Sequence, residues 1–179
     1  MKPIGEMTRR ELAAFIGAAF KKMNVSVVLS GGSCVSIYSD ESYVSMDLDF
    51  VNVGFAKRAT ITKIMAGLGF REENRYYCHP DTAFSIEFPP GPLGIGDEYV
   101  MQVDEIETET GCFKLLSPTD CVKDRLSWYY HANDLECLRQ AMLVASAHEI
   151  DLANVEAWSK RERKHVEFLK IREDLAKQG

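Results

Sequence analysis

The order of apolar and polar residues predicts helices near both ends of the chain. Thr8-Arg9-Arg10-Glu11 has the pattern of a helix capping box, and Leu12, Phe15, Ile16 and Phe20 follow it at helical spacing. We expect this first helix to end at about Met23. Similar apolar spacing and start signals predict further helices over residues 55–68, 118–130, 133–147, 151–163 and 164–177.

Short apolar runs between these helices are typical of β-strands. The expected strands cover residues 25–30, 70–79, 83–88, 98–103 and 111–115, and one more runs through Asp47 to Phe50. A short helix is expected over residues 33–39. This order of elements predicts an α+β (mixed α/β) fold, with an α/β core over residues 1–116 and a C-terminal helical region over residues 117–179.

The stretch from Val27 to Val53 carries the clearest chemical signal. The apolar run Val27-Val28-Leu29 ends at Ser30-Gly31-Gly32-Ser33, and Asp47-Leu48-Asp49-Phe50 follows after thirteen intervening residues. We interpret this as strand, glycine turn, short helix and strand. Side chains alternate along a strand, so Asp47 and Asp49 point to one face, and Met46, Leu48 and Phe50 point into a core.

Two carboxylates about 7 Å apart on one strand repel each other unless a cation lies between them. Oxygen ligands without a nearby His or Cys favour Mg²⁺ or Mn²⁺ over zinc. The glycines allow a close approach of the backbone, and amides at a helix start suit a phosphate. Together, the acidic pair and the glycine turn indicate a site that handles a nucleotide.

Composition limits the possible settings of such a site. The chain has 179 residues, a net charge of −6 and five cysteines. The odd number of cysteines and the absence of a CxxC pair favour reduced thiols and a cytoplasmic protein. The negative charge argues against a broad nucleic-acid surface. We find neither a signal peptide nor an apolar run long enough to span a membrane.

The motif resembles the signature of the nucleotidyltransferase superfamily. Leu29, Gly31-Gly32-Ser33, a spacer over residues 34–46 and Asp47-Leu48-Asp49 match its pattern of an apolar residue, a Gly-Gly or Gly-Ser pair, a spacer and Asp-x-Asp. Within that superfamily the chain looks most like the minimal nucleotidyltransferases and AbiEii-type toxins. Family enzymes often carry a basic residue in the spacer, whereas this chain has no Lys or Arg between Lys22 and Lys57.

The resemblance implies roles for further residues. Glu87 matches the third family carboxylate, which holds a metal and acts as a general base; the alternative is an exposed strand glutamate. A basic residue on the helix after Ser117 would contact phosphate, and both Lys123 and Arg125 fit. Asp134 would lie near the site, or it would be only an acid favoured at a helix start.

The reaction that the resemblance implies is transfer of a nucleoside monophosphate from a nucleoside triphosphate to a hydroxyl. Asp47, Asp49 and Glu87 would hold Mg²⁺ or Mn²⁺, and Gly31, Gly32 and Ser33 would hold the β and γ phosphates. The acceptor would be tRNA, a partner protein or a small molecule. The alternatives are a catalytically weak binding module, such as a toxin–antitoxin component, and a nucleotide sensor.

Overall fold

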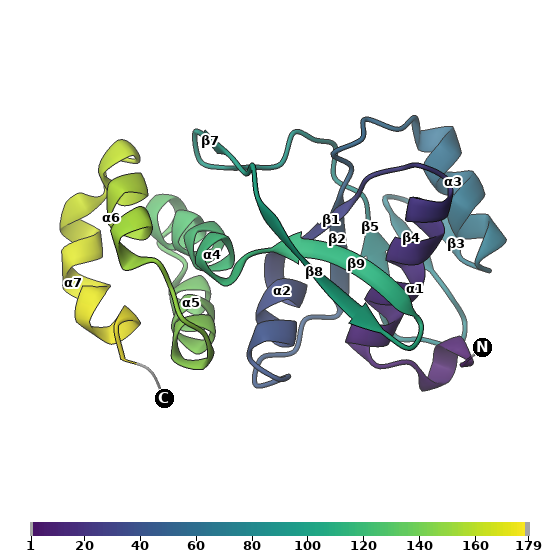
Figure 1. Ribbon diagram of the computed structural model, residues 1–179, viewed down its shortest axis with the longest axis horizontal. Helices are drawn as coiled ribbons and strands as arrows, with labels where there is room; N and C mark the ends of the chain where they lie inside the picture. Colours follow the sequence, from purple (N-terminus) through teal and green to yellow (C-terminus); the bar gives the residue numbers. More distant parts are fainter. Residues whose placement is uncertain (1, 178–179) are drawn as a thin grey trace. The chain divides into compact units, whose positions relative to one another are not determined.

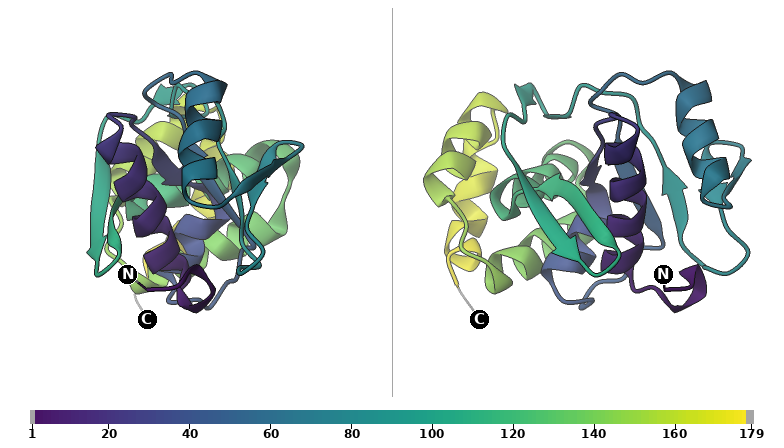
Figure 2. Two further views of the ribbon diagram at one scale, coloured as in Figure 1. Left: turned by 90° about the vertical axis from the view of Figure 1, so that its right-hand side faces the viewer. Right: turned by 45° about the vertical axis from the view of Figure 1, so that its right-hand side comes forward.

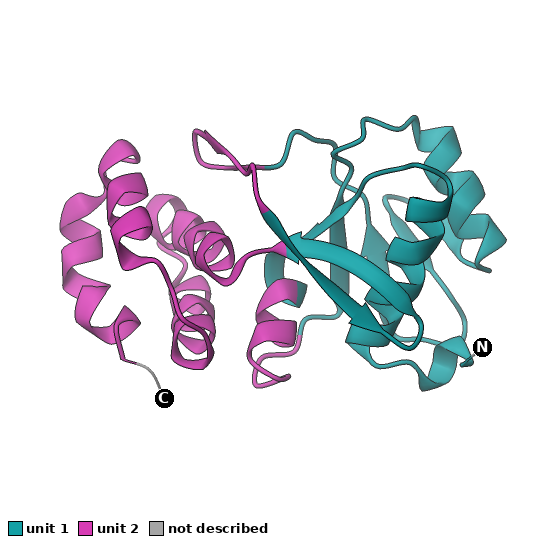
Figure 3. Cartoon of the chain, viewed as in Figure 1, with its two compact units in different colours: residues 1–33, 45–93, 103–115 teal, residues 34–44, 94–102, 116–179 magenta. Residues whose placement is uncertain are grey.

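The computed structural model describes residues 2–177, which form two compact units. Unit 1 contains residues 1–33, 45–93 and 103–115, and unit 2 contains residues 34–44, 94–102 and 116–179 (Figure 3). The predicted division at residue 116 lies next to the end of unit 1, while unit 2 also includes two earlier segments. No helix of the described chain is both long enough and apolar enough to cross a membrane.

Unit 1 is built on a mixed sheet of seven strands in the order β3-β4-β5-β2-β1-β9-β8 (Figure 1). The central pairs β1–β9 and β2–β5 are parallel, and β1–β2, β4–β5 and β3–β4 are antiparallel. The strands are β1 (Val28–Ser30), β2 (Asp47–Val51), β3 (Arg71–Glu73), β4 (Tyr76–Cys78), β5 (Ser85–Glu87), β8 (Val103–Thr108) and β9 (Gly111–Leu116).

Helices α1 (Arg9–Lys22) and α3 (Arg58–Gly67) contact each other beside this sheet (Figure 2). Thr8 and Glu11 form the predicted capping box of α1. The ring of Phe20 in α1 stacks on Phe88, which in turn stacks on Phe50 of β2. A side chain at Gly17 would come within 2.7 Å of the Phe113 side chain, so this glycine permits α1 to pack directly on β9.

Unit 2 is mainly helical. Its helices are α4 (Pro118–Ala132), α5 (Leu135–Ala147), α6 (Leu152–Arg161) and α7 (His165–Leu175), and α2 (Gly31–Tyr38) enters it from Cys34 onward. Ser117 caps α4 through the amide of Asp120, as predicted. A small hairpin of β6 (Gly94–Ile95) and β7 (Glu98–Tyr99) joins these helices, because the Trp158 indole donates to the Ile95 carbonyl at 3.2 Å.

Several predicted elements differ from the structure in local detail. Residues 70–79, expected as one strand, form the hairpin of β3 and β4, because Asn74 adopts a left-handed conformation (φ 61°) and turns the chain. Met46 is 48% exposed, whereas Leu48 and Phe50 are fully buried, because β2 begins only at Asp47. Within the expected strand 98–103, only Glu98 and Tyr99 pair with β6.

Candidate active site

Three carboxylates share one face of two neighbouring strands in unit 1. In the parallel pair β2–β5, Asp47 lies opposite Ser85 and Asp49 lies opposite Glu87. Leu48 and Ile86, the residues between them, are fully buried in the core. Because side chains alternate along strands and paired positions share a face, Asp47, Asp49 and Glu87 project from the opposite face. The register therefore brings the three predicted acids together.

The glycine bend lies next to this acidic face. Ser30, the last residue of β1, lies opposite Asp49, and α2 begins at the next residue, Gly31. Gly31 has a left-handed conformation (φ 68°), and a β-carbon there would lie 2.8 Å from Oδ2 of Asp49. Only glycine tolerates both conditions without cost. Gly32 follows in the first turn of α2, so the bend brings the start of this helix to Asp49.

Hydrogen bonds fix the start of β2 around Asp47. Its carboxylate accepts a hydrogen bond from the Ser85 hydroxyl, and its carbonyl accepts one from the buried Ser33 hydroxyl. Ser33 also accepts a hydrogen bond of 3.1 Å from the Arg9 guanidinium, which is 2% exposed and lies over the Phe84 ring. The Ser33 hydroxyl therefore ties α1, α2 and β2 together, whereas its predicted phosphate contact stays a prediction.

Glu87 has a different partner, the arginine in the turn between β3 and β4. Nε of Arg75 lies 3.6 Å from Oε2 of Glu87. A hydrogen bond to the Tyr76 hydroxyl and the negative charges of Glu87 and Asp49 raise the pKa of Arg75. The guanidinium therefore lies within the field of two of the three predicted acids, and it offsets part of their mutual repulsion.

The donor set suits a hard divalent cation. Mg²⁺ is commonly bound by one or two carboxylates together with substrate phosphates, and Asp47 and Asp49 supply two carboxylates on one face. Within residues 2–177, no group of three or more His, Cys, Asp or Glu side chains is arranged so that it could hold a metal ion. The residues thus fit a cation that is completed by a bound phosphate.

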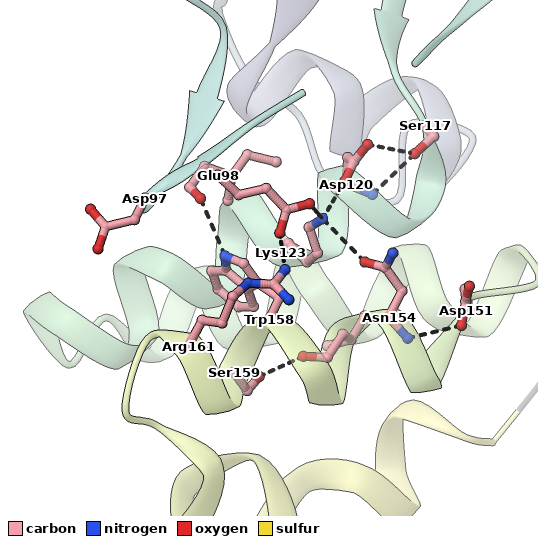
Figure 4. A network of polar contacts seen from close by, with 12 residues as sticks. Asp97, Glu98, Ser117, Asp120, Lys123, Asp151, Asn154, Trp158, Ser159 and Arg161 are labelled. Atoms are coloured by element: carbon pink, nitrogen blue, oxygen red, sulfur yellow. Dashed lines mark hydrogen bonds and ion pairs between the residues drawn. The ribbon is translucent and has the colours of Figure 1, made fainter. Parts of the chain in front are cut away.

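Lys123, a predicted phosphate contact, is buried within unit 2. Its side chain is 2% exposed, and its ammonium lies 2.7 Å from Asp120, 3.0 Å from Glu98 and 3.2 Å from the Asn154 oxygen (Figure 4). Glu98 also pairs with Arg161. Burial would raise the pKa of Glu98, but the hydrogen bonds from Lys123 and Arg161 outweigh it and lower that pKa. Lys123 thus links β7 to α4 and α6.

Arg125 and Asp134 also have partners within unit 2. The Arg125 guanidinium, 11% exposed, forms an ion pair of 2.5 Å with Asp124. Burial opposes its charge, yet Asp124 raises the pKa of Arg125 overall. Asp134 caps α5 by accepting hydrogen bonds of 3.0 Å from the Cys137 amide and 2.9 Å from the Glu136 amide, and the Cys137 contacts lower its pKa most. Their contacts with a nucleotide stay predictions.

The sequence did not indicate Arg9 and Arg75 as neighbours of the acids, nor the hydrogen bond from Ser85 to Asp47. Arg75 follows Asn74 between two short aromatic and polar runs, and Asn74 was the available sign of a turn, because asparagine tolerates a left-handed conformation. Ser85 precedes Glu87 by two residues, so its place on the acidic face followed from strand alternation. The reach of Arg9 to Ser33 spans 24 residues and had no local signal.

No family model and no curated protein matches the sequence significantly. Solved structures do resemble the chain. An antigenic nucleotidyltransferase-like protein from Paracoccidioides brasiliensis has a TM-score of 0.62 and 12% identity, covering 95% of this chain and 93% of that chain. The antibiotic-resistance factor ANT(2'')-Ia in solution has a TM-score of 0.55 and 15% identity, with coverages of 89% and 93%. The crystal structure of ANT(2'')-Ia with adenylyl-2''-tobramycin has a TM-score of 0.52 and 16% identity, covering 84% of this chain and 94% of that chain.

The chain has a nucleotidyltransferase-like fold. Identities this low establish the fold alone, and at that level the resemblance carried by Gly31-Gly32-Ser33 and Asp47-Leu48-Asp49 is confirmed. The mixed α/β class is confirmed as well. The narrower likeness to AbiEii-type toxins and minimal nucleotidyltransferases stays a prediction, and so do the individual site residues in this nucleotidyltransferase-like fold.

Gly31→Ala is expected to lower the free energy of unfolding by about 1–2 kcal/mol, because a left-handed alanine is strained. The Asp49 carboxylate must also move away from the new methyl group. Urea denaturation measures the loss. Gly67→Ala is the matched control, because nothing lies within 4 Å of its added carbon and it ends helix α3. An equal loss in both variants would contradict the strain argument.

Lys123→Met is expected to lower the free energy of unfolding by about 1–3 kcal/mol, because Asp120 loses its cation and Glu98 keeps only Arg161. Urea denaturation without nucleotide measures this. Lys160→Met removes a 54% exposed lysine that pairs with Glu156 on α6, and this control should cost less than about 1 kcal/mol. If Lys123→Met left the free energy of unfolding unchanged, the buried network would be dispensable for stability.

Proposed function

We propose that the chain is a metal-dependent nucleotidyltransferase, which moves a nucleoside monophosphate from a nucleoside triphosphate to a hydroxyl acceptor. One observation carries the proposal. Asp47 and Asp49 share a strand face with Glu87 in the register of β2 and β5, and Asp49 lies against the Gly31 bend. A nucleotidyltransferase-like fold around this arrangement supports the same chemistry, although the fold by itself assigns no substrate.

Asp47 and Asp49 would hold Mg²⁺ or Mn²⁺, with Glu87 as a further oxygen ligand. The cation supplies positive charge against the triphosphate oxygens and stabilises the charge on the leaving group. The amides of the first turn of α2, at Gly31, Gly32 and Ser33, would face the β and γ phosphates. Ser85 keeps the Asp47 carboxylate in place through its hydroxyl group.

Glu87 would act as the general base in the transfer step. A carboxylate oxygen of Glu87 takes the proton of the acceptor hydroxyl while that oxygen forms a bond to the α-phosphorus. The bond from the α-phosphorus to the oxygen that bridges to the β-phosphorus breaks, and pyrophosphate leaves with the bonding electrons. The acceptor thereby becomes a phosphodiester of the nucleoside monophosphate.

The proposed acceptors are RNA such as tRNA, a partner protein and a small molecule. The adenylyl-2''-tobramycin bound to ANT(2'')-Ia is a small-molecule example in a similar fold. The net charge of −6 offers no broad attraction to RNA, which also favours a small acceptor or a protein. A cytoplasmic location would supply both Mg²⁺ and nucleoside triphosphates to this chain.

A second candidate function is a nucleotidyltransferase-like binding module with weak or no transfer activity, such as a nucleotide sensor or a toxin–antitoxin component. The observation in its favour is that the acids already have partners: Asp47 accepts from Ser85, and Glu87 pairs with Arg75. A protein that binds a triphosphate without transferring it would need only the phosphate contacts. The two functions differ in whether the α-phosphate reaches an acceptor.

The double substitution Asp47→Asn and Asp49→Asn is expected to abolish Mg²⁺-dependent triphosphate binding, because amides are poor ligands for Mg²⁺. The fold should be kept or slightly stabilised, since two like charges are removed. Calorimetry with ATP, CTP, GTP and UTP plus Mg²⁺ measures binding. The double substitution Asp174→Asn and Glu136→Gln, in the exposed pairs with Lys177 and Arg139, is the charge-matched control. Wild-type binding by the double variant would refute the metal assignment.

Glu87→Gln is expected to lower kcat about a hundredfold or more while triphosphate still binds, because glutamine cannot accept the acceptor's proton. The assay follows α-³²P-labelled triphosphates with Mg²⁺, total RNA and cell extract, and detects label on RNA, protein or small molecules. Label transferred by the wild-type protein supports the enzyme. Binding of triphosphate by the wild-type protein without any transfer supports the sensor instead.

A further inference from the structure

Arg75 brings a positive charge to the acidic face of unit 1. It lies in the turn between β3 and β4, and its Nε is 3.6 Å from Oε2 of Glu87. Asp49, which lies opposite Glu87 across β2 and β5, also acts on it electrostatically. The guanidinium is thus close to the side chains that are proposed to hold the cation and to accept the acceptor's proton.

The Tyr76 ring holds this guanidinium in a defined place. The central carbon of the guanidinium lies 4.9 Å from the ring centroid, and Nη2 donates a 2.6 Å hydrogen bond to the Tyr76 hydroxyl. Tyr76 lies opposite Glu87 in the β4–β5 register, so both side chains project from the same face of the sheet. A stacked guanidinium keeps edge N–H groups available for a planar or tetrahedral anion.

The charge of a triphosphate needs a cation besides the metal, and the segment around the glycine bend supplies none. Residues 23–56, which include the whole of α2, contain no Lys or Arg. The guanidinium group matches phosphate oxygens with two parallel N–H groups, which makes arginine well suited to this task. Arg75 is 68% exposed, so a ligand can reach its guanidinium and take the place of Glu87 without disturbing the core.

We propose that Arg75 binds a phosphate of the nucleotide and neutralises Glu87 when no nucleotide is bound. This inference rests on the proposed function and adds to it a specific phosphate contact. This change of partner, from Glu87 to a phosphate, has opposite effects on the binding of a metal ion alone and on the binding of the nucleotide. In the free protein, Arg75 competes with a divalent cation for Glu87. In the nucleotide complex, it adds a charge-assisted hydrogen bond and leaves Glu87 ready to accept a proton.

Arg75→Gln tests both effects with one variant. For Mn²⁺ alone, titrated by electron paramagnetic resonance, we expect binding about two- to fivefold tighter, because the competing charge is gone. For each nucleoside triphosphate with Mg²⁺, we expect binding about tenfold weaker, because a hydrogen bond to a charged group is lost. Inorganic tripolyphosphate with Mg²⁺ should lose affinity by a similar factor, since the contact is to phosphate and not to the base.

Arg139→Gln is the matched control. Arg139 is 80% exposed and pairs with Glu136 on α5, so the substitution removes the same charge from a surface ion pair away from the Arg75 turn. This control should leave Mn²⁺ and triphosphate affinities within about twofold of the wild type. Circular dichroism and thermal unfolding check that both variants keep the fold, which the exposure of both side chains favours.

Unchanged triphosphate binding by Arg75→Gln would overturn the inference, and so would weaker Mn²⁺ binding. If Arg75→Gln bound triphosphate normally but the double variant Asp47→Asn and Asp49→Asn did not bind triphosphate with Mg²⁺, the proposed function would stand without Arg75. If Arg75→Gln lost affinity for nucleoside triphosphates but not for tripolyphosphate, the inference would also be overturned, because the arginine would then recognise the nucleoside. If the wild-type protein bound no triphosphate with Mg²⁺, both proposals would fail together.

Discussion

The parallel pairing of β2 with β5 is the constraint on which the candidate site depends. Its register places Asp49 opposite Glu87 and Asp47 opposite Ser85, while Leu48 and Ile86 fill the core behind them. A shift of this register by one residue would turn the carboxylates into the apolar interior, at a cost far above that of any contact they make on the outer face. The buried positions therefore enforce the position of the acids.

Neighbouring residues accommodate the three carboxylates that this pairing brings to one face. The Gly31 bend lets the start of α2 approach Asp49, the Ser85 hydroxyl bonds Asp47, and Arg75 pairs with Glu87. In unit 2, the buried Lys123 is balanced by Glu98 and Asp120, which explains how a lysine with 2% exposure is tolerated. The buried charge of Lys123 is thus matched by hydrogen-bonded partners.

The sequence predicted the parts of this site that depend on local pattern. Asp47 and Asp49 share a face because strands alternate, and Ser117 and Thr8 cap helices because their side chains bond amides within one turn. It did not predict the pairing of β2 with β5 residue by residue, because register depends on long-range packing. It also missed the turn at Asn74, where a left-handed conformation divides a run that reads as one strand.

The same pairing has a consequence for how the protein reaches its working form. Asp47 and Ser85 are separated by 38 positions, so pairing of their strands closes a loop that contains α3 and the hairpin of β3 and β4. Closing such a loop costs conformational entropy before the pairing stabilises the chain, and contacts of this kind slow folding. During synthesis on the ribosome, a nascent chain that ends before β5 has Asp47 and Asp49 but lacks Glu87.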